Sequence, residues 1–468
     1  MKRITVEGRA DMMLNQPLKQ VIPRLAVPTI ISMLITSVYN MADTYFVSRI
    51  STEASAAVGV VYSAMALIQA LAFTIGMGSG ANVSQSLGAG REDEAKRLVA
   101  VGFFTAFTLG VVLGILGNID LERLVIMLGA TPECVPDAIA YARYIFIAAP
   151  FMMCSFVMNN HLRFQGMAVF AMFGISSGGI LNMILDPLLI FGLGLGTAGA
   201  AMATAISQAV SFTILLSIAN TRSELLHYRF SNFRPTAAMY GKIFYTGVPS
   251  LGRQGIAAVA NIILNNVAGS ISADPLVNTA AIAAMSISRK FILFVNSAVI
   301  GFGQGFQPVA AYCYGAKRYK RVQEAYWFCG KVATVILLCL AAAAMAFSEQ
   351  IIRLFRGEDP LVVSIGTGAL RMQLLTLPLW GFYTMANMCT QSIGHGLSST
   401  IVSSARQGIF LIPMVTILPA FLGITGLQAA QPAADVLAFI LGFVIMHRVL
   451  KTLDKLELSN NLENSAHV

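Results

Sequence analysis

Long apolar runs alternate with short polar gaps along almost the whole chain. Each run holds about 20 residues or more, which is the length of α-helix that crosses roughly 30 Å of hydrocarbon. The pattern therefore predicts an all-α membrane protein with twelve transmembrane helices. The runs cover residues 21–48, 55–83, 97–118, 136–161, 167–192, 198–219, 243–269, 279–304, 325–347, 361–387, 399–421 and 425–449.

Composition excludes a soluble globular enzyme. Hydrophobic residues make up 56% of the 468 positions and charged residues only 11%, against roughly a quarter charged in an ordinary soluble domain. The net charge of +9 does not indicate nucleic-acid binding, because Lys and Arg lie in the gaps between apolar runs and form no basic face with interleaved aromatics. We expect membrane lipid as a partner and no nucleic acid.

The positions of the cations predict the orientation of the helices. If the N-terminus is inside, most Lys and Arg, Arg406 among them, fall in inner segments. This bias places both termini in the cytoplasm of a multi-pass protein of the inner (cytoplasmic) cell membrane. The first apolar run is too long for a signal peptide, so we expect it to be retained. The outer segments hold only Arg49, Arg123, Arg143, Arg353 and Arg356.

The chain also repeats itself. The stretch "SQSLGAGREDEAKRL" after the second run resembles "AAYCYGAKRYKRVQEA" after the eighth, and Pro150 resembles Pro378, both at an offset of about 227 residues. An offset of six helices predicts two parallel six-helix repeats, an N-lobe and a C-lobe, around a central cavity. We expect a cytoplasmic N-terminal segment at 1–20, the N-lobe at 21–220, a cytoplasmic linker at 221–241, the C-lobe at 242–452 and a cytoplasmic tail at 453–468.

Two carboxylates inside apolar runs are the strongest candidates for function. A charge at the centre of a membrane helix costs about 2.5–3.5 kcal/mol, so such a residue is rarely incidental. Asp43 lies about seven residues before the outer end of the first run, and Asp186 six to eight residues before the outer end of the fifth. At 1.5 Å per residue both lie roughly 10 Å below the outer edge, so they can share one layer.

Other polar residues fit the same layer. Asn182 precedes Asp186 by four positions and shares its helix face, and Asn40 precedes Asp43 by three. By depth, Thr204 of the sixth run and Tyr141 of the fourth can join them. These groups could form an oxygen-lined pocket for a proton or Na⁺. Taken singly, Asn182, Thr204 and Asn40 could equally serve as hydrogen bonds between helices.

Pro187 changes the expected backbone beside Asp186. A proline has no amide hydrogen, so the Met183 carbonyl loses its helical donor, and helical geometry is disfavoured at Asp186. A free carbonyl beside a carboxylate could help to bind Na⁺ or relay a proton. We therefore count Met183 among the candidates.

The second half has cations in place of carboxylates. Arg289 and Lys290 in the eighth run could line a cavity, pair with an acidic group, or serve only packing. Enzyme chemistry is not expected, because the five histidines lie at helix ends or in the tails. The glycine-rich stretch 75–90 lacks the Lys-Ser/Thr of a phosphate-binding loop, so we expect no ATPase site and no cofactor.

Several segments together resemble one family over nearly the whole chain. They are "YNMADTYFVSRI", "GAGREDEAKR" and, most specifically, "LNMILDPLLIFGLGLGTAGAAMATAIS". They resemble the multidrug and toxic-compound extrusion (MATE) family in its prokaryotic, DinF-like or MepA-like branch. The resemblance implies a secondary antiporter that exchanges H⁺ or Na⁺ for amphipathic, mostly cationic drugs or metabolites by alternating access, acting as a monomer.

The resemblance also implies roles for particular residues. The coupling cation, including Na⁺, would bind at Asp43, Asp186, Asn182 and Thr204, with Tyr141 beside them. Two residues would line or reshape the drug cavity: Pro28, which matches the family's first-helix proline, and Asn159. One departure is that the second half presents Arg253, Arg289 and Lys290 without a clear carboxylate cluster. A lipid-linked precursor flippase of the same superfamily is the alternative, in which these cations would bind phosphate.

Overall fold

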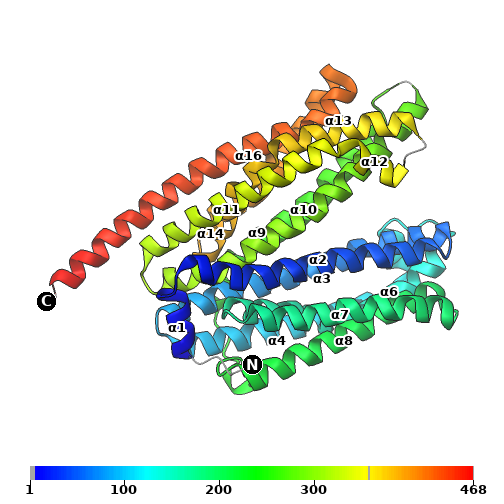
Figure 1. Cartoon of the computed structure of the whole chain (residues 1–468). Helices are drawn as coiled ribbons and strands as arrows, with labels where there is room; N and C mark the ends of the chain where they lie inside the picture. The colour runs from blue at the N-terminus through cyan, green and yellow to red at the C-terminus, as the bar shows by residue number, and fades with distance from the viewer. Residues whose placement is uncertain (1–5, 273, 357–358, 467–468) are drawn as a thin grey trace. The chain divides into compact units, whose positions relative to one another are not determined.

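The structure is a computed structural model that describes residues 6–272, 274–356 and 359–466. It consists of long helices joined by short loops, and it divides into two compact units, Met1–Leu251 and Gly252–Val468. Helices α2, α3, α6, α7 and α8 of the first unit run side by side (Figure 1). The first unit contains α1 (Val6–Leu14), α2 (Leu18–Ser48), α3 (Thr52–Gly88), α4 (Glu92–Ile119), α5 (Leu121–Met127), α6 (Val135–Phe164), α7 (Ala168–Pro187), the π-helical turn η1 (Leu188–Gly192), α8 (Gly196–Arg222), the short η2 (Phe230–Asn232) and the start of α9 (Ala237–Ala268).

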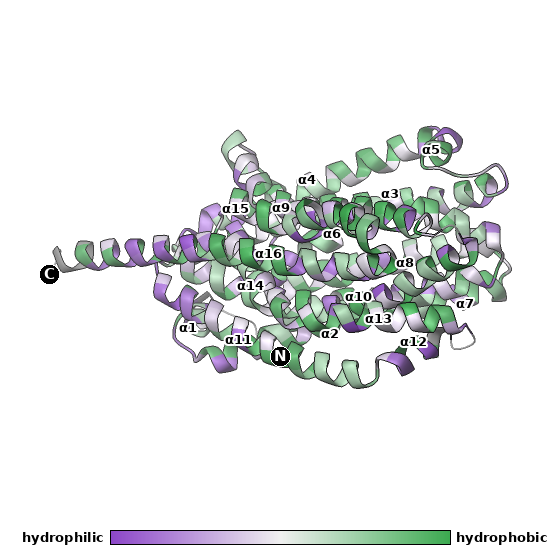
Figure 2. Ribbon diagram, turned by 90° about the horizontal axis from the view of Figure 1, so that it is seen from above, coloured by the Kyte–Doolittle hydropathy of each residue, from purple (hydrophilic) through white to green (hydrophobic). Residues whose placement is uncertain are grey.

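The second unit continues from α9 into a further set of long helices. Figure 2 shows apolar residues along most of the long helices and a more polar C-terminal end of α16. The elements are α10 (Pro275–Gly315), α11 (Tyr319–Ala346), α12 (Ser348–Arg356), α13 (Pro360–Thr376), the 3₁₀ turn η3 (Leu377–Leu379), α14 (Trp380–Ser392), α15 (Gly396–Ser404), the π-helical turn η4 (Ala405–Phe410) and α16 (Leu411–Ala466).

The helices confirm the predicted all-α membrane architecture. Within the described residues, ten stretches are long and apolar enough to cross a membrane. One of them, Gly396–Leu462, contains two helices, because the backbone turns sharply at Gly423 with φ 55°. The 32-residue α9 is also long enough to cross a membrane, although it is not among these ten stretches. With α9 and the division at Gly423, the helices of the described residues match the twelve predicted runs.

Glycines allow close helix packing in the first unit. On α4, Gly110, Gly114 and Gly117 face Phe146 and Pro150 of α6. A Cβ at Gly110 would lie 2.6 Å from the Pro150 Cα, and one at Gly114 would lie 2.8 Å from the Phe146 carbonyl oxygen. Small residues at this spacing let two helices approach closely in a membrane, where lipid gives little hydrophobic drive to associate.

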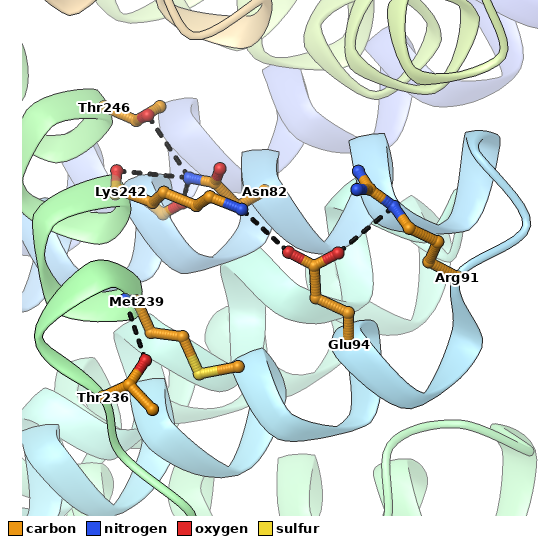
Figure 3. Close-up of polar contacts among 8 residues, drawn as sticks. Asn82, Arg91, Glu94, Thr236, Met239, Lys242 and Thr246 are labelled. Atoms are coloured by element: carbon orange, nitrogen blue, oxygen red, sulfur yellow. Dashed lines mark hydrogen bonds and ion pairs between the residues drawn. The ribbon is translucent and has the colours of Figure 1, made fainter.

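The first part of α9 packs against α3 and α4 within the first unit (Figure 3). A side chain at Gly78 of α3 would meet the Ile243 carbonyl. Beside this contact the Asn82 side-chain amide donates to the Lys242 carbonyl over 3.3 Å. The Lys242 ammonium in turn pairs with Glu94 of α4 at 2.9 Å. These contacts join the start of α9 to the first compact unit, which ends inside α9 at Leu251.

Arg406, which was counted among the inner cations, forms an ion pair inside the second unit. It lies in η4, ten residues after the start of the span at Gly396, which is roughly 15 Å along a helix. Its guanidinium pairs with Asp435, whose side chain is fully buried. Because the two partners are 29 positions apart in sequence, charge position alone does not reveal the pair.

The α3–α9 contact predicts a specific sensitivity. Replacing Gly78 by Ala should force α9 away from α3 and cost about 1–3 kcal/mol, the usual effect of overpacking a close contact. The matched control is Gly59→Ala on the same helix, where an added Cβ meets nothing within 4 Å. Thermal unfolding in detergent should show a lower Tm for Gly78→Ala only. Equal Tm values for the two variants would contradict the contact.

Candidate functional site

Four helices of the first unit bring together the polar residues predicted to act as one group. Asp186 and Asn182 come from α7, Thr204 from α8, Tyr141 from α6 and Asp43 from α2. The Asp186 side chain is completely buried, and Asn182, Thr204 and Tyr141 are also buried. We call these five residues the carboxylate cluster. Burial of this much polarity is sustained only where the groups satisfy one another or bind something else.

Asn182 is the centre of the hydrogen bonds in the carboxylate cluster. Its side-chain amide donates to Asp186 Oδ1 over 3.2 Å and to Thr204 Oγ1 over 3.3 Å. The first bond spans one turn of α7, and the second ties α7 to α8. The buried Tyr141 of α6 lies beside Thr204. Two helices are therefore tied together at one carboxylate, with a third packed beside them.

Asp43 approaches the same group from α2. It is close enough to Asp186 for the two carboxylates to interact electrostatically. It also lines a pocket of about 270 Å³ between α2 and α3, together with Asn40, Thr44 and Tyr62. Asp186 is fully buried, whereas Asp43 lines this pocket.

Three oxygen atoms of the carboxylate cluster have no hydrogen-bond donor among the described residues. They are Asp43 Oδ1, Asn182 Oδ1 and Asp186 Oδ2, and all three are buried. A buried acceptor without a donor is costly by about 1–3 kcal/mol. Such oxygens fit a hard cation, because carboxylate and amide oxygens are the ligands that hard cations prefer. They fit a proton equally well, because a proton turns one carboxylate into a donor to its neighbour.

A second, smaller cavity adjoins the carboxylate cluster. It holds about 20 Å³ and is lined by Tyr39, Asn182, Thr204, Ser207 and other residues of α2, α6, α7 and α8. That space suffices for about one water molecule. Tyr39 precedes Asp43 by one helical turn and has both carboxylates as charged neighbours. The sequence reasoning missed Tyr39, although its spacing of four from Asp43 is the signal that would have found it.

Pro187 does not break its helix at Asp186. The α-helix runs through Asp186 to Pro187 and then widens into the π-helical turn η1, in which the Leu193 amide donates to the Leu188 carbonyl. The expected departure from helical geometry at Asp186 was therefore wrong. Widening of this kind is a common response to an interrupted hydrogen-bond ladder. The carboxylate keeps its helical spacing from Asn182 while the following turn is displaced.

The five remaining candidates lie in varied surroundings. Asn40 lines the pocket beside Asp43. Asn159 lies outside the carboxylate cluster, because its side-chain amide donates over 2.9 Å to the Ala171 carbonyl and ties α6 to α7. Pro28 is buried in α2, and Met183 is partly buried on α7. Arg289 lies in the second unit, where its buried Nη2 has no acceptor among the described residues.

Comparison with known proteins decides the family. A sequence profile of the MatE family matches residues 28–188 and again residues 249–417, once in each half of the chain. The chain belongs to the MatE family. This confirms the resemblance inferred from the repeated motifs and the segment around Asp186. It makes the protein a multi-pass membrane transporter and not an enzyme.

Individual MATE relatives match over nearly their full length. The multidrug export protein MepA of Staphylococcus haemolyticus is 26% identical over 436 residues, which are 92% of this chain and 94% of that protein. An outward-facing structure of a multidrug resistance MATE family transporter of the MOP superfamily is 28% identical, with a TM-score of 0.89, and the match covers 95% of this chain and 98% of that one.

A third relative is described in terms of the charge of its pocket. The Pyrococcus furiosus MOP superfamily transporter, for which a reverse polarity of the binding pocket is said to suggest a different function, is 27% identical with a TM-score of 0.87. The match covers 95% of this chain and 98% of that one. Together with the other likenesses it confirms the twelve-helix MATE fold.

The hydrogen bonds of Asn182 generate a prediction for the carboxylate cluster. Asn182→Leu keeps the side-chain volume but removes two donated hydrogen bonds and the Oδ1 atom that has no donor. The apparent affinity of the carboxylate cluster for H⁺ or Na⁺ should therefore fall by about tenfold or more. The measurement is the H⁺ or Na⁺ concentration that half-saturates substrate efflux from proteoliposomes. Ser177→Ala is the matched control, because this exposed hydroxyl of α7 bonds only to the Phe173 carbonyl. An unchanged half-saturation in Asn182→Leu would rule out a role for its amide.

Proposed function

We propose that this MATE transporter is a multidrug efflux antiporter of the cell membrane. It exports amphipathic, mostly cationic organic compounds in exchange for H⁺ or Na⁺. The observation that carries the proposal is the carboxylate cluster, in which three buried oxygens lack a donor. An acceptor set of this kind is stable when a cation occupies it and costly when it is empty.

Cation occupancy drives the transport cycle in this proposal. A proton or Na⁺ at Asp43 and Asp186 neutralises two carboxylates and changes the hydrogen bonds that Asn182 makes to α7 and α8. The arrangement of the lobes, residues 21–220 and 242–452, then shifts toward the state that suits the neutral cluster. The drug and the cation need no common atoms, because coupling requires only that they prefer different states.

Location and gating follow from the same scheme. Both termini face the cytoplasm, and the protein acts as a monomer. The α2–α3 pocket lined by Asp43 and Asn40 admits the cation to the carboxylate cluster. Pro28, Asn159 and Met183 act at the drug cavity, where bending of α2 near Pro28 alters the space beside the cluster.

A second candidate function is supported by the unpartnered guanidinium of Arg289. Its buried Nη2 has no acceptor among the described residues, and an arginine fork matches a phosphate well. A flippase for a lipid-linked phosphate precursor would use such a group. It would not require a carboxylate pair that exchanges cations, so dependence on a cation gradient separates the two functions.

A gradient-swap assay tests the proposed function. Proteoliposomes are loaded with a fluorescent cationic dye, and a pH gradient or a Na⁺ gradient is imposed in turn. Wild-type protein should export dye under one of them. Asp43→Asn and Asp186→Asn should each abolish gradient-driven export, because an amide cannot take up a proton and binds Na⁺ poorly, while expression remains normal.

Asp137→Asn provides the matched control for these variants. This carboxylate on α6 accepts a bond of 2.8 Å from the Thr197 hydroxyl and lies outside the carboxylate cluster. An amide oxygen can accept the same bond, so export should persist. Wild-type export rates in both Asp43→Asn and Asp186→Asn would contradict the proposed coupling site.

A further inference from the structure

A buried ionic group in the second unit lies outside the carboxylate cluster. Asp435 of α16 accepts four side-chain hydrogen bonds from three helical segments of this unit and from its own helix, so its oxygens are fully satisfied. The donors are Arg406 Nε at 2.7 Å, Gln431 Nε2 at 2.8 Å, Trp380 Nε1 at 3.0 Å and Thr376 Oγ1 at 3.1 Å.

Arg406 satisfies Asp435 with only one of its donors. Its guanidinium carbon lies 3.4 Å from the centre of the Trp380 ring, which holds the planar group in one orientation. No partner for Nη1 or Nη2 is present among the described residues. The Arg406 side chain is 12% exposed, so it is not completely enclosed by protein. Arg406 therefore presents a fixed pair of amino groups with nothing bound to them.

Arg253 is a second cation close to the segment that carries Arg406. It belongs to α9, is partly buried and has no carboxylate within ion-pair distance among the described residues. A Cβ at the neighbouring Gly252 would lie 3.5 Å from the Ser404 hydroxyl, and one at Gly408 would lie 2.7 Å from the Ile256 side chain. The segment 252–256 of α9 thus lies along segment 404–408, which carries Arg406.

Tyr383 of α14 lies near both cations. Its hydroxyl donates to the Val402 carbonyl, and its charged neighbours are Arg253, Arg406 and Asp435. Two guanidinium groups and one carboxylate therefore surround Tyr383, with a net positive charge of one. Arg406 lies about 15 Å into its span, where an uncompensated charge costs several kcal/mol. A negative group bound at this point would offset that cost.

We propose that Arg253 and Arg406, with Tyr383 between them, bind an oxyanion, the carboxylate of an exported compound. An arginine fork binds carboxylate or phosphate through parallel charge-assisted hydrogen bonds, and Trp380 preorganises one such fork. The substrates that use this site carry a carboxylate as well as a cationic group. This inference rests on the proposed export function and assigns a binding site for one group of its substrates.

A pair of dyes that differ in one group tests the site. Tetramethylrhodamine carries a cationic ring system and a free carboxylate, whereas its methyl ester has the same ring system without the negative charge. The full chain is reconstituted in proteoliposomes of neutral lipid, and the pH or Na⁺ gradient that drives export is imposed. The KM of the free acid should rise by about tenfold or more in Arg253→Gln and Arg406→Gln, since a charge-assisted bond is lost. The KM of the methyl ester should stay within about twofold.

Two further variants separate binding from a structural effect. Arg448→Gln removes an exposed arginine of the same unit and should change neither KM. Because Arg406→Gln leaves Asp435 without its cation and can unfold the protein, Arg406→Lys and a Tm measurement accompany it. Arg253 has no carboxylate partner, so Arg253→Gln alone still decides the proposal. Equal changes for both dyes, or no change for either, would overturn it.

A lipid phosphate is the other possible source of the oxyanion. Proteoliposomes of phosphatidylglycerol are compared with those of phosphatidylcholine. If the carboxylate proposal is right, the selective loss of the free acid in Arg253→Gln is the same in both lipids. If phosphatidylglycerol instead raises transport of both dyes in wild type and Arg253→Gln removes that increase, the site binds lipid phosphate and the proposal is wrong.

Direct binding distinguishes a failure of this inference from a failure of the proposed function. Fluorescence polarisation of the free acid with the detergent-solubilised full chain needs no gradient. Weaker binding in Arg253→Gln with unchanged binding of the methyl ester supports the site even if no dye is exported. Absence of export of the methyl ester by wild type under either gradient would count against the proposed function alone. Identical binding of the free acid to both proteins would overturn the inference.

Discussion

The central constraint on this protein is the burial of carboxylates among membrane helices. Asp186 is fully buried, yet one of its oxygens and one of Asp43 have no donor among the described residues. Asn182 joins Asp186 to Thr204, and the buried Tyr141 of α6 lies beside them. The bonds that tie α7 to α8 thus depend on the charge of one side chain. In the proposed function, cation binding acts on helix packing through this arrangement.

The two units differ in how their buried carboxylates are compensated. In the second unit Asp435 is saturated by four donors, and the remaining polarity is positive, from Arg406 and Arg253. In the carboxylate cluster of the first unit the excess is negative, at Asp43 and Asp186, while Arg9 and Arg163 are buried elsewhere in that unit. The two halves therefore share a fold but differ in the charge of these polar groups. Such a division suits a transporter in which one half exchanges cations and the other contacts the anionic part of a substrate.

Much of the fold was predictable from sequence, because it depends on helix length and periodicity. Depth counting along the helices predicted that Asn182, Asp186 and Thr204 could meet, and they are hydrogen-bonded. Features that depend on packing were not accessible in this way. Asn159 bonds to the Ala171 backbone, which only the approach of α6 to α7 reveals. The ion pair of Arg406 with Asp435 joins residues 29 positions apart, so the positions of the charges alone did not reveal it. The π-helical turn after Pro187 likewise replaces the expected distortion at Asp186.

The most direct test of the central claim is the exchange of cation for substrate at equilibrium, without any membrane. Purified protein in weakly buffered detergent solution is titrated with a cationic dye while released H⁺ or Na⁺ is recorded. Wild type should release cations as the dye binds, because the two ligands favour different states. A protein with both Asp43 and Asp186 changed to Asn should bind dye and release none. Equal release from the double variant would contradict the assignment of the coupling site to these two carboxylates.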